Sequence, residues 1–202
     1  LTYSQSFFDG KMQNIFFAKD YVNHPNIRQT DQSTVTGSDK VQGSTTKNYF
    51  GYGTGLRYMF FDPLAVKVSY EHSVRLPIAR ELLGNGTTIY ANVALKPEKS
   101  NNVNLALFGT WHPAGRHTIY YEANGFLRYV DNYIQTSVIE KEGMMQFVND
   151  PAVHIKGVEG EIRYDWDGRL QLMANVSYQD ARDQQKYKED GKPSATYDNH
   201  VP

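Results

Sequence analysis

Apolar and polar side chains alternate along much of the chain, as expected for β-strands with one apolar and one polar face. In residues 65–76 one face is charged or hydroxylated, with Lys67, Ser69, Glu71, Ser73 and Arg75. The same alternation predicts seven more strands, at residues 1–8, 12–21, 49–60, 103–111, 118–134, 158–164 and 170–178. The pattern therefore predicts an all-β chain with about eight strands, and a ninth that begins near Asn199.

The connections between these strands alternate in length. Short turns are predicted at residues 9–11, 61–63, 112–116 and 165–168, and long polar loops at residues 22–47, 77–98, 135–153 and 181–198. Strict alternation places all long loops at one end of the sheet. Outer-membrane β-barrels have this layout, with short periplasmic turns and long extracellular loops. We therefore predict an antiparallel up-and-down transmembrane β-barrel segment.

Strand length and composition favour the same fold. Several predicted strands exceed the usual length of about 5–6 residues and suit a tilted membrane strand, which needs about 9–11. The chain contains 15 tyrosines and 10 phenylalanines, and aromatic residues form the girdles of membrane barrels. No apolar run reaches the roughly 18 residues that a transmembrane helix requires.

Other functions find little support in the sequence. The formal net charge of −1 does not predict binding to nucleic acid. The chain has no cysteine, and its six histidines lack metal-ligand spacing, so we predict no metal site and no cofactor. Glu159, Glu161 and Arg163 share a strand face and are explained by a barrel lumen of mixed charge. Without a nucleophile elbow or phosphate loop, no catalytic residue is predicted.

A soluble β-sandwich remains as the alternative fold, because a soluble antiparallel sheet also has one wet face. It would serve as an adhesion or carbohydrate-binding module. A sandwich predicts a closed core within these 202 residues. A segment of a larger barrel predicts instead a sheet whose outer strands lack partners.

The stretch from Val68 to Leu107 contains Arg-x-Pro at the end of a strand, then Glu-Leu-Leu-Gly, then Asn-x-x-Leu-Lys-Pro-Glu-x-Ser-x-Asn. This order resembles the late barrel of TonB-dependent outer-membrane receptors. The matching residues are Arg75, Pro77, Glu81, Leu82, Gly84, Asn92, Leu95, Lys96, Pro97, Glu98, Ser100 and Asn102. Val93 stands where that family often has proline. Residues 155–161 resemble the family's Lys-Gly-Val-Glu strand start, and residues 199–202 resemble the lead-in to the following strand.

Most of these motif residues are expected to shape the wall and its loop. Pro97 cannot donate to a strand ladder and belongs at a strand start, and Pro77 ends its strand. Lys96 and Glu98 are expected on one strand face, where they can pair. Gly84 permits the positive φ of a loop turn.

The resemblance implies a receptor in the outer membrane of a Gram-negative bacterium. Such a receptor imports a scarce nutrient (an iron chelate or siderophore, cobalamin, an oligosaccharide or a peptide) with energy from the TonB complex. Its barrel of about 22 strands encloses a plug domain. Residues 1–202 are then expected to form a partial barrel, without the plug, the N-terminal strands or the final strands. The expected partners are the nutrient, the plug, the TonB complex and outer-membrane lipid.

By the same resemblance, the long loops are the expected place of ligand binding. Arg80, Glu81 and Tyr90 in the second long loop, with Tyr133 and Gln135 in the third, are the candidate ligand contacts. For each of them a role in loop packing is the alternative.

Overall fold

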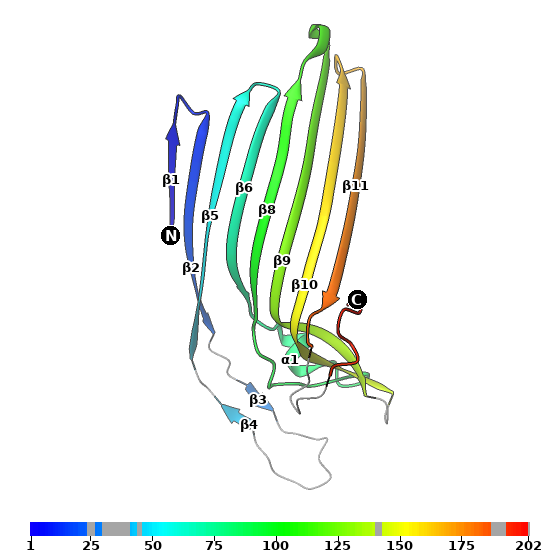
Figure 1. The fold of residues 1–202 in the computed structure, drawn as a ribbon. Helices are drawn as coiled ribbons and strands as arrows, with labels where there is room; N and C mark the ends of the chain where they lie inside the picture. Colours follow the sequence, from blue (N-terminus) through cyan, green and yellow to red (C-terminus); the bar gives the residue numbers. More distant parts are fainter. Residues whose placement is uncertain (24–26, 30–40, 44–45, 140–142, 187–192, 202) are drawn as a thin grey trace.

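The computed structural model of the chain describes residues 1–23, 27–29, 41–43, 46–139, 143–186 and 193–201. One large sheet dominates it (Figure 1). Its main strands are β1 (Thr2–Phe7), β2 (Met12–Asn23), β5 (Lys47–Phe61), β6 (Leu64–Arg75), β8 (Glu98–Trp111), β9 (His117–Ile139), β10 (Met144–Trp166) and β11 (Leu170–Asp183). They follow one another across the sheet in chain order, and every neighbouring pair is antiparallel. The predicted up-and-down topology is confirmed.

Smaller elements lie in the connections. β3 (Ile27–Gln29) and β4 (Val41–Gly43) pair as a separate two-stranded sheet in the first long loop. The second long loop contains α1 (Ala79–Leu83) and β7 (Ile89–Tyr90). A 3-10 turn, η1 (Pro113–Gly115), joins β8 to β9. Within the described ranges, no helix is long and apolar enough to cross a membrane.

The sorting of connections by length is confirmed at three of the four long loops. Figure 1 shows the short turns after β1, β5, β8 and β10 together at the upper end of the sheet. The strand ends that flank the first, second and fourth predicted long loops lie at the lower end. Residues 24–26, 30–40, 44–45 and 187–192 of these loops lie outside the described residues. A 23-residue strand such as β9 extends about 76 Å at roughly 3.3 Å per residue. The hydrocarbon layer is about 30 Å thick, so β9 and β10 are long enough to continue well past it.

The prediction of a third long loop at residues 135–153 is wrong. β9 continues to Ile139 and β10 already begins at Met144, so most of that range is a paired β-hairpin. The Asn149-Asp150-Pro151 sequence has the composition of a turn, yet pairing continues on both sides of Pro151. The residues 155–161, which resembled a strand start, consequently lie inside β10.

The register assigns the two faces of the sheet, because directly paired residues share a face. Large apolar side chains are exposed along one of them, here named the apolar face: Leu56, Val68, Leu105, Leu107, Leu127, Val158, Ile162, Leu172 and Val176. The opposite, polar face carries residues such as Lys67, Asn104, Glu122, Asn124 and Glu159. No second sheet among the described residues covers the apolar face, so the sandwich alternative does not describe this chain.

The sheet does not close on itself in the part of the chain that the structure describes. β1 and β11 are the two ends of the strand order and do not pair with each other. Beyond β11, the Asp183 N–H donates to the Asn199 carbonyl and the Val201 N–H donates to the Ala181 carbonyl, both at 3.0 Å. The chain therefore turns back along β11 at residues 199–201, where the ninth strand was predicted.

Candidate functional site

The long-loop end of the sheet contains most of the buried apolar side chains. Val74, Ile89, Leu95, Val130, Ile134 and Val153 are all buried there. Two segments meet at this end: residues 76–97, here called the strap, and residues 132–139 with 143–150, here called the hairpin. Ile89 and Leu95 belong to the strap and Ile134 to the hairpin, so these two segments contribute three of the six buried side chains.

The strap begins at a three-residue ion cluster. The Arg75 guanidinium donates to both carboxylate oxygens of Glu98, at 2.6 and 2.7 Å, and to Glu81 at 2.9 Å. Bidentate pairs of this kind fix geometry as well as charge. Glu81 also accepts the Ile78 N–H at 2.9 Å, and Glu98 accepts the Ile134 N–H at 2.7 Å. The cluster therefore joins β6, α1, β8 and β9.

The two carboxylates stabilise the charged form of Arg75. The hydrogen bond to Glu98 is the largest cause that raises the pKa of Arg75 above its ordinary value, and the bond to Glu81 raises it further. Glu81 is buried, so its carboxylate needs the Arg75 cation as a partner. The expected pairing of Lys96 with Glu98 on one strand face is not formed. Glu98 opens β8, whereas Lys96 precedes that strand.

A tight turn shapes the tip of the strap. Gly84 has a φ of +66°, and a Cβ there would meet the Ile89 carbonyl oxygen at 2.1 Å, so only glycine fits. The Asn85 side-chain oxygen accepts the N–H groups of Thr87, Thr88 and Ile89 at 2.8–3.1 Å. The expected positive φ at Gly84 is thereby confirmed. The turn leads into β7, which pairs with β10.

The strap is bonded to β10, three strands from β6. β7 pairs in parallel with Met145 and Gln146 of that strand. Asn92 donates its side-chain amide to the Phe147 carbonyl at 2.7 Å. Asn149 accepts the Lys96 N–H at 2.8 Å and donates to the Lys96 carbonyl at 2.9 Å.

The five candidate ligand contacts lie on these two segments. Arg80 is exposed on α1, Glu81 is buried in the ion cluster, and Tyr90 is half-buried in β7. Tyr133 pairs with Asp150, and the Gln135 side chain donates to Asp150 at 3.0 Å. The fold brings all five to one end of the sheet. Their role in ligand binding stays a prediction.

The remaining motif residues are structural in their contacts. Pro77 follows the end of β6 and Pro97 directly precedes β8, as expected. Asn102 lies on the polar face and donates to Ser73 and Ser100, at 3.2 and 3.0 Å.

Sequence reasoning missed Asn149 and Asp150. Both fell in a range that was taken as a loop, although Asn149 holds the strap and Asp150 is buried in the hairpin. Burial raises the pKa of Asp150, the nearby Asp183 carboxylate raises it further, and a hydrogen bond from the Ala152 N–H lowers it. The sequence did contain a signal, because asparagine side chains such as those of Asn92 and Asn149 can complete backbone hydrogen bonds. Which backbone groups they bond can be seen only in the folded structure.

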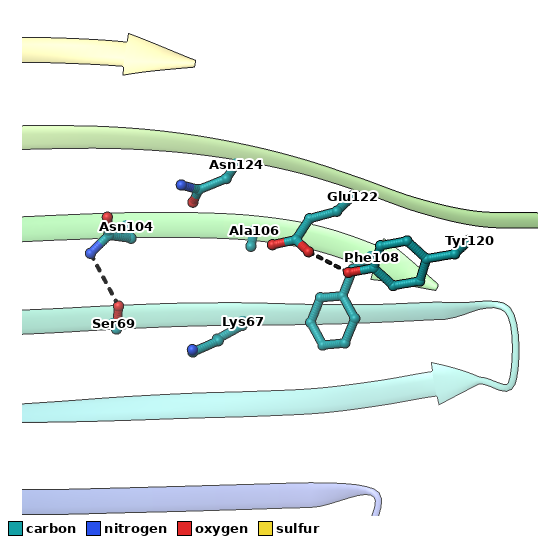
Figure 2. A pocket seen from close by; sticks show the side chains of 8 residues that line it. All are labelled: Lys67, Ser69, Asn104, Ala106, Phe108, Tyr120, Glu122 and Asn124. Atoms are coloured by element: carbon teal, nitrogen blue, oxygen red, sulfur yellow. Dashed lines mark hydrogen bonds between the residues drawn. The ribbon is translucent and has the colours of Figure 1, made fainter. Parts of the chain in front are cut away.

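A second feature lies on the polar face, where a hollow of about 370 Å³ opens over β6, β8 and β9. Figure 2 shows Lys67 of β6 on one side, Glu122 of β9 on the other, and Asn104 and Ala106 of β8 between them. Asn104 donates to Ser69 at 3.3 Å, and Tyr120 donates to Glu122. Lys67 forms no ion pair with any residue that the structure describes. The wall thus presents separated charges of opposite sign.

Sequence comparison decides the family. A family model for the TonB dependent receptor-like β-barrel matches residues 12–201, which is nearly the whole chain. The chain belongs to the TonB-dependent receptor-like β-barrel family. The resemblance found in residues 68–107 is confirmed, and so is the assignment as a segment of a receptor barrel. Members of this family are outer-membrane transport receptors of Gram-negative bacteria rather than enzymes.

Solved receptor structures share the fold at low sequence identity. The "Copper transporter OprC" has a TM-score of 0.70 and 18% sequence identity, over 95% of this chain and 28% of that chain. A double mutant of the Serratia marcescens hemophore receptor HasR, in complex with its hemophore HasA and heme, has a TM-score of 0.60 and 15% identity, over 96% of this chain and 37% of that chain. The ferric-catecholate import receptor Fiu from K12 E. coli, in its closed form, has a TM-score of 0.52 and 17% identity, over 91% of this chain and 26% of that chain. The TonB-dependent receptor segment therefore spans 26–37% of these chains. The comparison with curated proteins gave no match.

Proposed function

We propose that this chain forms barrel wall and extracellular loops of an outer-membrane receptor that actively imports a scarce nutrient into a Gram-negative bacterium. The observation that carries the proposal is the division of one sheet into an apolar face and a polar face, with the strap and hairpin at one end. An exposed apolar band suits outer-membrane lipid, and a polar face suits a barrel interior.

The polar face supports a plug domain as a partner. The hollow between Lys67 and Glu122 places a cation and a carboxylate on opposite sides of uncharged Asn104 and Ala106. A plug surface with an acidic group toward Lys67 and a basic group toward Glu122 would complement it. The TonB complex would then act through that plug and supply the energy of transport.

The nutrient belongs to one of the classes that the family resemblance implied: an iron chelate or siderophore, cobalamin, an oligosaccharide or a peptide. The names of the structural neighbours, which mention copper, heme and a ferric catecholate, support uptake of a metal-containing nutrient. In our proposal Arg80, Tyr90, Tyr133 and Gln135 face the ligand, and Glu81 contributes by holding the strap.

Uptake by whole cells tests the proposal. The gene of the complete receptor is deleted, and uptake of a ferric catecholate, heme, cobalamin and copper is compared with that of a complemented strain. We expect deletion to abolish saturable uptake of one of them. A protonophore should stop this uptake while binding to the cell surface remains, because TonB-driven transport needs the proton gradient. Unchanged uptake of all four would contradict metal-nutrient import.

A further inference from the structure

The strap takes a longer route than its end points require. β6 and β8 are neighbours in the sheet, so a short turn could join them. Instead the chain runs to β10 and pairs with it through β7 before it returns (Figure 1). Bonds to β10 at both ends of residues 88–96 fix this route: the Met145 N–H donates to the Thr88 carbonyl at 2.9 Å, and Asn149 bonds Lys96.

Asn149 uses its whole side-chain amide for this attachment. Its oxygen accepts the Lys96 N–H at 2.8 Å, and its nitrogen donates to the carbonyls of Lys96 and Asn132, at 2.9 and 2.8 Å. The side chain of an asparagine offers one acceptor oxygen and two N–H donors. Asn149 therefore bonds the end of the strap to β9 and β10 in place of a strand ladder.

The attachment is reciprocal along the strap. Asn92 donates from the strap to the Phe147 carbonyl at 2.7 Å, and Gln146 donates from β10 to the Ala91 carbonyl at 2.9 Å. Ile89 and Leu95 of the strap are both about 8% exposed. Paired backbone, satisfied amides and buried apolar side chains are the features of a segment that opens only as part of a larger unit.

We propose that the strap and the hairpin form a single rigid arm at the barrel mouth, with Asn149 as its positioning residue. This inference rests on the proposed function, because it concerns how the ligand-facing residues are presented. Arg80 and Tyr90 on the strap hold a fixed position relative to Tyr133 and Gln135 on the hairpin. The ligand meets one preset surface instead of two loops that close independently.

Hydrogen exchange on the complete, ligand-free receptor in detergent tests the arm without requiring a ligand. Asn149→Ala removes a side chain of the hairpin, and exchange is then measured in the other segment, the strap. The reporters are the backbone N–H groups of Asn85 and Asn92, which donate inside the strap to the carbonyls of Ile89 and Leu82. We expect these amides to exchange at least about tenfold faster, because loss of the attachment lets the strap open locally. The reciprocal variant Asn92→Ala should accelerate exchange of hairpin residues 144–148.

The control is Ser137→Ala, an exposed hairpin residue, and it should change neither segment. Amides of residues 158–165 in the wall report on global stability and should keep their rates in every variant. Faster exchange confined to the segment that carries each substitution would show two independent loops and overturn the proposal. Faster exchange across the wall would overturn it as well. A receptor that transports none of the four tested nutrients would contradict metal-nutrient import and leave the arm intact.

Discussion

Two glycines on the polar face are explained by a phenylalanine on the neighbouring strand. A Cβ on Gly157 would meet Cζ of Phe126 at 2.4 Å, and a Cβ on Gly53 would meet Cζ of Phe17 at 2.4 Å. Each phenylalanine is the direct cross-strand partner of its glycine. The ring lies over backbone that the glycine leaves uncovered, an arrangement that stabilises strand pairing.

Gly157→Ala is expected to destabilise the barrel. The added methyl group would also approach the Tyr178 carbonyl oxygen at 2.5 Å, so backbone as well as the Phe126 ring must shift. Overpacking of this kind costs about 1–3 kcal/mol, and urea unfolding of the detergent-solubilised receptor measures it. Gly125→Ala is the matched control, because nothing lies within 4 Å of a Cβ at that position. Equal effects at both sites would contradict this explanation.

Asp150 is expected to make the stability of the hairpin depend on pH. Because burial and Asp183 raise the pKa of Asp150 in the folded state, the folded hairpin holds the proton more tightly than the unfolded chain does. Its stability is therefore highest below the ordinary aspartate pKa of about 3.9 and falls as the pH rises through the raised value. Protection factors of residues 144–150, measured between acidic and neutral pH, should decrease accordingly.

Asp150→Asn should remove this dependence. The amide oxygen can still accept from Gln135, but no carboxylate is buried beside Asp183, so hairpin protection at neutral pH should rise. A variant that retained the full pH dependence would assign the effect to another group.

Within a single strand, the two faces predict opposite responses to the same substitution. Ala123 and Asn124 are neighbours in β9, the first on the apolar face opposite Leu107 and the second on the polar face near Glu159. Ala123→Arg places a charge toward lipid and should cost about 2–4 kcal/mol near the bilayer midplane. Asn124→Arg should be nearly neutral, because the lumen is polar and Glu159 is close. Unfolding in lipid vesicles measures both, and a reversed order would assign lipid to the wrong face.

The strands also show how far element prediction reached. Residues 65–76 and 170–178 alternate cleanly because each has one wet face, and both strands formed where predicted. The ends of β9 and β10 were missed. Their polar residues, among them Asn149 and Asp150, are satisfied by the strap and by each other. Contacts between segments more than 50 residues apart in the chain produce no local alternation of apolar and polar residues from which a strand could be predicted.

At the scale of the whole molecule, the sorted connections predict which end faces the exterior. The chain contains no cysteine, so each introduced cysteine provides a single label within it. Thr87→Cys at the strap tip should react with a membrane-impermeant maleimide on intact cells, because Thr87 is exposed and the proposed function places the long loops outside the cell. Arg169→Cys in the turn between β10 and β11 should react only after the outer membrane is permeabilised. Labelling of both residues, or of Arg169→Cys alone, on intact cells would refute this orientation.

Local patterns in the sequence determined the alternation of faces, the short turns and the family motif from Arg75 to Asn102, because each of these depends on residues close in the chain. The tertiary structure alone decided that the strap crosses to β10, that the third predicted loop is a hairpin, and that Arg75, Glu81 and Glu98 meet. These features depend on hydrogen bonds and ion pairs between distant segments. Such groups become partners only after the sheet has set their positions.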